Sequence, residues 1–269
     1  MNNLTVILEI DPRGVATVTL NRPEKHNAFD DAIIAELREA FDTLAKRDDV
    51  RVVILASSGK SFSAGADLGW MKRMAEYDFG HNLKDAELLA GMLKALHDLP
   101  QPTIARVQGA AFGGAVGLVS CCDMAVGSER ASFSLSEVKI GLMPATISPY
   151  VIKAIGERAS RRYFTTAERF NAAEAHRIGL LSEVVTEDQL DRTIAALVNT
   201  LLANGPLAVR AAKDLIAGVA GKEISPELIE DTCVRIAHIR VSEEGQEGLG
   251  AFLNKRSPNW ISNQDKDNV

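Results

Sequence analysis

The 269-residue sequence lacks the features that mark membrane, secreted and nucleic-acid-binding proteins. No stretch reaches the roughly 18 uninterrupted apolar residues of a membrane span, and the start, MNNLTVILEIDPRG, has no basic segment before an apolar core, as a signal peptide has. The formal net charge is -6, which argues against a broad nucleic-acid-binding surface. We therefore expect a cytoplasmic protein with neither a membrane nor a nucleic acid as its partner.

Cysteine is scarce, and several catalytic motifs are absent. Three cysteines, Cys121, Cys122 and Cys233, are an odd number without CxxC spacing, which favours a reducing compartment. The five histidines are scattered and form no HExxH, so no metal site is predicted. The G-x-S-x-G motif of serine hydrolases is missing, and no stretch matches the P-loop or the G-x-G-x-x-G dinucleotide fingerprint.

Strand-like and helix-like segments alternate in the first part of the chain. The β-branched runs LTVILEI, GVATVTLN and VRVVILAS predict strands, and residues 30–46 have helical spacing of apolar positions. The pattern recurs as TIARVQG, a helix from Gly114, DMAVGS and ASFSL. This alternation predicts an α/β fold with helices packed outside the strands.

The pattern changes near residue 188. The stretches LDRTIAALVNTLLANGPLAVRAAKDLIAGVA and SPELIEDTCVRIAHIRVSEEGQEGLGAFLNKR have helical periodicity and almost no strand signal. We therefore expect an α/β core over residues 1–187 and a helical region over residues 188–269. Such a region either docks on another subunit or covers the core.

Two glycine-containing turns each follow a predicted strand and precede a predicted helix. In GAAFGGAVGL (109–118) a helix begins at Gly114, and in SFSAGADL (61–68) Ala64, Gly65 and Ala66 form the turn. The first N–H groups of a helix have no acceptor within it and suit a phosphate or an oxygen that gains negative charge in a reaction. Close helix packing is the alternative explanation for the glycines.

Four motifs in order resemble those of the crotonase superfamily, the enoyl-CoA hydratases and isomerases: NRPEKHNAF (21–29), SFSAGADL (61–68), GAAFGGAVGLVSCCD (109–123) and SLSEVKIGLMP (134–144). The resemblance covers nearly the whole chain. It implies a spiral of repeated ββα units, a C-terminal helical region that builds a homotrimer or homohexamer, and an acyl-CoA thioester substrate. Coenzyme A is then part of the substrate, and no separate cofactor is expected.

The resemblance also implies roles for individual residues. The N–H groups of Ala66 and Gly114 would hold the thioester oxygen as an oxyanion, and Glu137 would be the catalytic acid/base. The nearest other acids have simpler expected roles, since Asp67 is placed to cap the helix that begins at Leu68 and Asp123 to be structural. The residues implied to line or close over coenzyme A are Lys25, His26, Ala64, Asp67, Leu68, Phe252 and Lys255.

Gly117 departs from the hydratase pattern, which has a second glutamate at this position. Residues 109–164 look most like bacterial methylglutaconyl-CoA hydratases of leucine breakdown and carboxygeranoyl-CoA hydratases, and PATISPYV (144–151) differs from straight-chain hydratases. A branched substrate is expected, and an enoyl-CoA isomerase or a non-catalytic acyl-CoA-binding protein stays open. We expect Gly117→Glu to place a carboxylate toward C3 of the substrate, with a cost from crowding.

Overall fold

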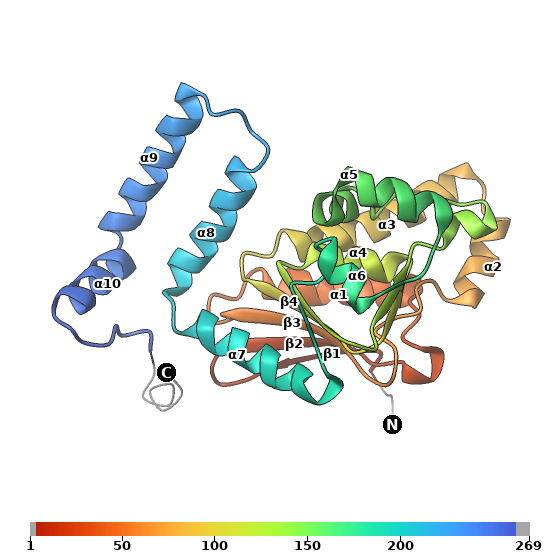
Figure 1. Cartoon of the computed structure of the whole chain (residues 1–269), viewed down its shortest axis with the longest axis horizontal. Helices are drawn as coiled ribbons and strands as arrows, with labels where there is room; N and C mark the ends of the chain where they lie inside the picture. The colour runs from red at the N-terminus through yellow and green to blue at the C-terminus, as the bar shows by residue number, and fades with distance from the viewer. Residues whose placement is uncertain (1–3, 262–269) are drawn as a thin grey trace. The chain divides into compact units, whose positions relative to one another are not determined.

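A computed structural model describes residues 4–261 (Figure 1). Strands and helices alternate up to Val185, and only helices follow. The strands are β1 (Val6–Ile10), β2 (Val15–Leu20), β3 (Val52–Ser57), β4 (Thr103–Val107), β5 (Ala110–Phe112), β6 (Met124–Ser128), β7 (Ser132–Ser134), β8 (Phe170–Asn171) and β9 (Glu183–Val185). The α-helices are α1 (Asp31–Leu44), α2 (Leu68–Glu76), α3 (Phe79–His97), α4 (Gly114–Cys121), α5 (Ser148–Thr166), α6 (Ala172–Arg177), α7 (Leu190–Leu202), α8 (Pro206–Val219), α9 (Pro226–Val241) and α10 (Glu243–Leu253).

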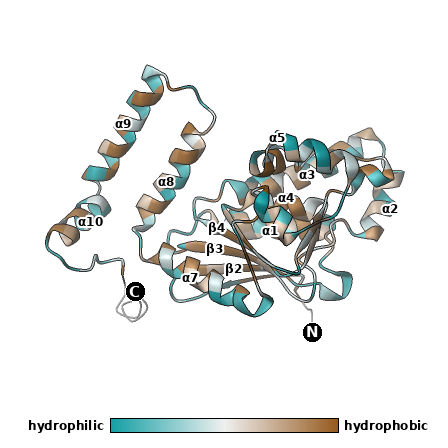
Figure 2. Cartoon of the chain, in the orientation of Figure 1, coloured by the Kyte–Doolittle hydropathy of each residue, from teal (hydrophilic) through white to brown (hydrophobic). Residues whose placement is uncertain are grey.

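The strands form two sheets. The larger has the order β1-β2-β3-β4-β6-β9, in which only β1 and β2 pair antiparallel. Its central strands are nearly continuous apolar runs, as parallel strands covered on both faces require, and Figure 2 shows them as hydrophobic. In the smaller sheet, β5 and β8 flank β7. The strands predicted from the apolar runs are confirmed.

Helices α1, α3, α4 and α5 gather beside the larger sheet (Figure 1). In α1 the apolar spacing buries Ile33, Leu37 and Phe41, and Asp30 caps its start by accepting a hydrogen bond from the N–H of Ile33 at 3.1 Å. Helix α3 packs against α1 and α4, and it has no counterpart among the predicted elements. The two glycine turns lie just before the starts of α2 and α4.

By its internal contacts the chain divides into two compact units. The first comprises the described residues through Leu99 with Thr103–Ile194, and the second comprises Pro100–Pro102 with the described residues from Ala195 onward. The predicted functional division after residue 187 stays a prediction. No single helix within residues 4–261 is long and apolar enough to cross a membrane, although the bent pair Glu187–Leu202 and Pro206–Val219 meets the length and composition test.

Within the second unit, side-chain caps fix the helices. The carboxylate of Glu244 accepts hydrogen bonds from the N–H groups of Leu207 and Ala208 at the start of α8, and Ser225 caps α9. Many apolar side chains of these helices stay exposed, and Figure 2 shows hydrophobic stretches on α8 and α9. The exposed residues are Leu207, Leu215, Ile216, Ile229, Val234, Ile236, Val241, Leu249, Phe252 and Leu253.

Candidate active site

Backbone hydrogen bonds join the motif at 21–29 to the turn before α2. Phe29 and Ala66 form a parallel bridge, in which the N–H of Phe29 donates to the carbonyl of Gly65 at 2.9 Å. The N–H of Asp67 donates to the carbonyl of Phe29 at 3.0 Å. These bonds use the groups on either side of Ala66 and leave its own N–H pointing away from the bridge.

A second bridge brings the same turn against the start of α4. The N–H of Ser63 donates to the carbonyl of Ala110, and the N–H of Phe112 donates to the carbonyl of Ser63, both at 3.0 Å. Gly65 has a φ of +89°, and a Cβ there would lie 2.8 Å from the carbonyl oxygen of Phe112 and 4.0 Å from Cα of Gly113. Only glycine allows this approach, which places the two turns side by side.

The N–H groups of Ala66 and Gly114 have no hydrogen-bond acceptor in the part of the chain that the structure describes. Gly114 is the first residue of α4, so its N–H has no intrahelical partner and lies at the positive end of the helix dipole. The ring of buried Phe29 packs where a Cβ of Gly114 would be, at 2.6 Å. Two adjacent, unpaired donors suit a substrate oxygen that gains negative charge.

Glu137 lies against the same turn. It begins a 3-10 helix, Glu137–Ile140, and its Oε1 is 3.2 Å from the position that a Cβ of Gly113 would occupy. Its Oε2 is buried, and no donor among residues 4–261 reaches it. Burial raises the pKa of the Glu137 carboxyl, and a hydrogen bond from its own N–H opposes this only in part. A half-buried carboxyl with a raised pKa, beside unpaired N–H groups, is suited to proton transfer.

A partly buried ion-pair network lies beside the turn at Ala66. The guanidinium of Arg22, 11% exposed, donates to Asp30 at 2.8 Å and to Asp67 at 2.5 Å. Asp67 also caps α2, as predicted, by accepting from the N–H groups of Gly69 and Trp70. Burial raises the pKa of Asp67, but these two N–H groups and the more exposed Lys25, 3.4 Å away, together hold it below its usual value. Sequence reasoning missed Arg22, although it lies inside the recognised motif.

The predicted coenzyme A residues fall in two places. His26 and Ala64 lie beside the turn at Ala66, because the N–H of Ala64 donates to the carbonyl of His26 at 2.9 Å. The exposed Leu68 begins α2. Phe252, near the end of α10, and Lys255, just after it, belong to the second unit, and Phe252 is 81% exposed. The role of all these residues in binding coenzyme A stays a prediction.

Gly117 does not face open space. A Cβ on Gly117 would lie 2.3 Å from Cγ2 of Ile147 and 2.8 Å from its Cβ. Ile147 is buried and stands just before α5. The expectation that a glutamate at position 117 reaches the substrate stays a prediction, and the contacts with Ile147 show the source of its expected crowding cost. The unusual PATISPYV stretch contains Ile147 and was the available signal.

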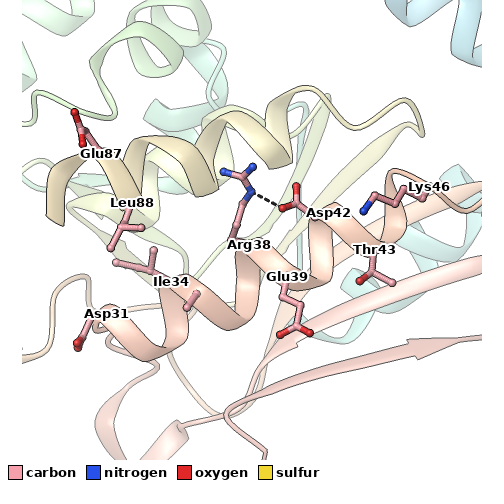
Figure 3. A pocket seen from close by; sticks show the side chains of 10 residues that line it. Asp31, Ile34, Arg38, Glu39, Asp42, Thr43, Lys46, Glu87 and Leu88 are labelled. Atoms are coloured by element: carbon pink, nitrogen blue, oxygen red, sulfur yellow. Dashed lines mark hydrogen bonds and ion pairs between the residues drawn. The ribbon is translucent and has the colours of Figure 1, made fainter. Parts of the chain in front are cut away.

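A surface groove of about 440 Å³ between α1 and α3 lies apart from these residues. Charged side chains line it, and Arg38 and Asp42 form an ion pair across 2.7 Å at its edge (Figure 3). None of the predicted site residues lines this groove. The cluster around Gly114 and Glu137 is therefore the candidate active site.

Comparisons with known proteins bear on the fold and the family of the chain. The sequence profile described as enoyl-CoA hydratase/isomerase matches residues 11–263. An enoyl-CoA hydratase structure from Shewanella pealeana is 46% identical, with a TM-score of 0.92 over 96% of each chain. AtuE from Pseudomonas aeruginosa is 32% identical, with a TM-score of 0.92 over 96% of this chain and 100% of that one. The 2,3-dehydroadipyl-CoA hydratase of Escherichia coli is 30% identical and covers 91% of this chain and 94% of its own. The predicted crotonase-like α/β fold with C-terminal helices is confirmed, and its strands form two sheets.

Proposed function

Because this chain belongs to the enoyl-CoA hydratase/isomerase family, we propose that it adds water across the double bond of a branched 2-enoyl-CoA. The N–H groups of Ala66 and Gly114 hold the thioester oxygen, and Glu137 moves the proton. The observation that carries the proposal is the unpartnered, buried Oε2 of Glu137 beside the turn that holds the unpaired N–H of Gly114.

The proposed reaction needs one carboxylate. The Glu137 carboxylate takes a proton from water as the water oxygen bonds to C3, and the electron pair of the double bond moves toward the thioester oxygen. The two N–H groups stabilise the resulting enolate. Glu137 then returns its proton to C2, which regenerates the carboxylate and leaves a 3-hydroxyacyl-CoA.

Two features support a branched substrate of the 3-methylglutaconyl-CoA kind, from leucine or isoprenoid acid breakdown. Gly117 supplies no second carboxylate, and the stretch containing Ile147 differs from that of straight-chain hydratases. The E. coli relative is named for 2,3-dehydroadipyl-CoA, a thioester of a dicarboxylic acid, which favours an acyl group that carries its own carboxylate.

Gly117 also favours a second candidate, an enoyl-CoA isomerase. In that reaction Glu137 would move a proton between C2 and C4 while the same N–H groups hold the enolate oxygen. A protein that only binds acyl-CoA is the third alternative, and a buried carboxylate kept without a hydrogen-bond partner argues against it, because such a group costs stability.

Two further parts of the proposal concern the assembly of the chain into an oligomer and the residues that contact coenzyme A. The exposed apolar residues of the second unit, among them Ile216 and Val241, suit contacts between copies of the chain in a homotrimer or a homohexamer. Phe252 and Lys255 are proposed to close over coenzyme A, and Lys25 and His26 are proposed to contact it. Sedimentation velocity of the purified chain distinguishes a trimer from a hexamer, and a monomer would contradict this assembly.

The test is the loss of ultraviolet absorbance of the conjugated enoyl thioester on a panel of three substrates: 3-methylglutaconyl-CoA, crotonyl-CoA and a 3-enoyl-CoA. We expect absorbance to fall with 3-methylglutaconyl-CoA faster than with crotonyl-CoA. A rise in absorbance with the 3-enoyl-CoA and no loss with the other two would establish the isomerase instead. Binding without turnover of any substrate would establish the acyl-CoA-binding protein.

A further inference from the structure

Ile147 occupies the space into which a side chain at position 117 would project. Its Cγ2 and Cβ lie 2.3 and 2.8 Å from the position of a Cβ on Gly117, and Cδ2 of Leu93 in α3 lies at 3.5 Å. Ile147 is 2% exposed. Distances below about 3 Å require a movement, and close-packed interiors resist movement of this kind. The side chain of Ile147 therefore packs directly against the backbone of Gly117, with no room for a Cβ between them.

The same chain segment supplies the carboxylate and this isoleucine. It runs from Glu137 to Ile147, with Glu137 against Gly113 and Ile147 against Gly117, one turn further along α4. The three atoms nearest to a Cβ at position 117 are hydrocarbon atoms of Ile147 and Leu93, and such surroundings disfavour a charged side chain. The start of α4 therefore faces the carboxylate of Glu137, and its next turn faces the apolar side chains of Ile147 and Leu93.

We infer that Ile147 is a specificity-determining residue: with Gly117 it closes this side of the site to a second carboxylate and restricts the enzyme to one-carboxylate hydration. The inference rests on the proposed function. Substrates that need two protein carboxylates are then disfavoured, and branched acyl groups that bring their own carboxylate are accepted. Both residues determine the preference for branched over straight-chain substrates. Changing Gly117 or Ile147 alone therefore does not alter this preference.

A double-mutant cycle measured as Tm tests the contact between Gly117 and Ile147 and needs no activity assay. Gly117→Ala adds only the Cβ and should lower Tm by about 3–8 °C, although alanine is the better helix former. Ile147→Ala removes Cγ2 but keeps the Cβ that lies 2.8 Å from the added methyl group, so in that background Gly117→Ala should lower Tm by less than half as much as in the wild type. Ile147→Val is the matched control, because it removes only Cδ1 and keeps Cγ2, so the penalty of Gly117→Ala should persist.

A second arm tests specificity in the full-length protein. The ratio of kcat/KM for crotonyl-CoA to that for 3-methylglutaconyl-CoA should rise at least ten-fold in Gly117→Glu/Ile147→Ala relative to the wild type. It should stay within about two-fold of the wild type in Gly117→Glu/Ile147→Val. Ile147→Ala alone should not raise it, because a cavity supplies no carboxylate.

Each outcome bears on one claim. Equal Tm changes for Gly117→Ala in the wild-type, Ile147→Val and Ile147→Ala backgrounds would overturn the pairing, even if the glutamate variants fail to fold. A clear cycle on stability with no change in the substrate ratio for a folded Gly117→Glu/Ile147→Ala would overturn the specificity role and leave the proposed function standing. Failure of the proposed function would appear separately, as a wild type that hydrates neither substrate.

Discussion

Replacing Glu137 with glutamine tests the centre of the mechanism with the smallest change of shape. Glutamine keeps the side-chain length, so it fills the space against Gly113, but it neither takes a proton from water nor returns one to C2. We expect kcat to fall by about 10²–10⁴-fold, equivalent to roughly 3–5 kcal/mol of transition-state stabilisation. KM should change little, because the N–H groups of Ala66 and Gly114 stay in place.

The same substitution should stabilise the fold at neutral and alkaline pH. Burial raises the pKa of Glu137 above its unfolded value, and Oε2 has no donor within residues 4–261. The stability contributed by the protonated form is fully present below the unfolded pKa and is lost as pH rises through the folded pKa. A neutral amide avoids this loss, which we place on the order of 1 kcal/mol, or 2–4 °C in Tm.

The assay combines thermal unfolding from pH 4 to 9 with rates on 3-methylglutaconyl-CoA. The Tm advantage of Glu137→Gln should shrink toward zero as pH falls to the ordinary range of a glutamate. In the wild type, kcat/KM should fall on the acid side at a pH above that range, because protonation removes the base. A variant with wild-type turnover would exclude Glu137 from proton transfer, and a Tm difference independent of pH would refute the claim that burial disfavours its charge.

Three further substitutions test the surroundings of Glu137. Gly114→Pro removes one oxyanion donor and should give a kcat at least 100-fold lower than that of Gly114→Ala. The alanine variant is the control, because it brings the same Cβ against Phe29 but keeps the N–H, and equal rates for the two variants would contradict the donor role. Gly65→Ala should cost about 2–4 kcal/mol in urea unfolding, since its φ is +89° and its Cβ would meet the Phe112 carbonyl; unchanged stability would argue against the close approach. Arg22→Gln should lower the free energy of unfolding by about 3 kcal/mol and also lower kcat, because it leaves the partly buried carboxylates of Asp30 and Asp67 without the guanidinium that pairs with them. An unchanged kcat would show that these ion pairs do not position Ala66.

Much of the fold follows from local patterns that the chain makes plain. The β-branched runs predict β1, β2 and β3, because β-branched residues favour extended strands. The caps are equally local, as Asp67 at the start of α2 shows. Asp123 was expected to be structural, and its carboxylate accepts hydrogen bonds from the N–H and the hydroxyl of Thr103.

Helix α3 illustrates what local patterns miss. Its apolar residues serve two neighbours, α1 and α4, so they do not form the single stripe by which an amphipathic helix is recognised. The buried state of Glu137 depends in the same way on packing between distant segments. The sequence identified the glutamate through a resemblance, but the missing partner of Oε2 and the contact with Gly113 required coordinates.

The glycines at the start of α4 explain why a stretch that matches no nucleotide motif is still rich in glycine. Each one leaves room for a different group: Gly113 for the carboxyl of Glu137, Gly114 for the ring of Phe29, and Gly117 for Ile147. A phosphate-binding loop needs glycine so that its backbone reaches the ligand, whereas these three glycines also leave room for side chains of the protein itself. The G-G-x-x-G spacing thus follows from the helical turn, since residues three and four apart share a face. A bulkier residue at any of the three positions displaces a distinct neighbour, so the pattern of lost stability or lost turnover should identify which contact was broken.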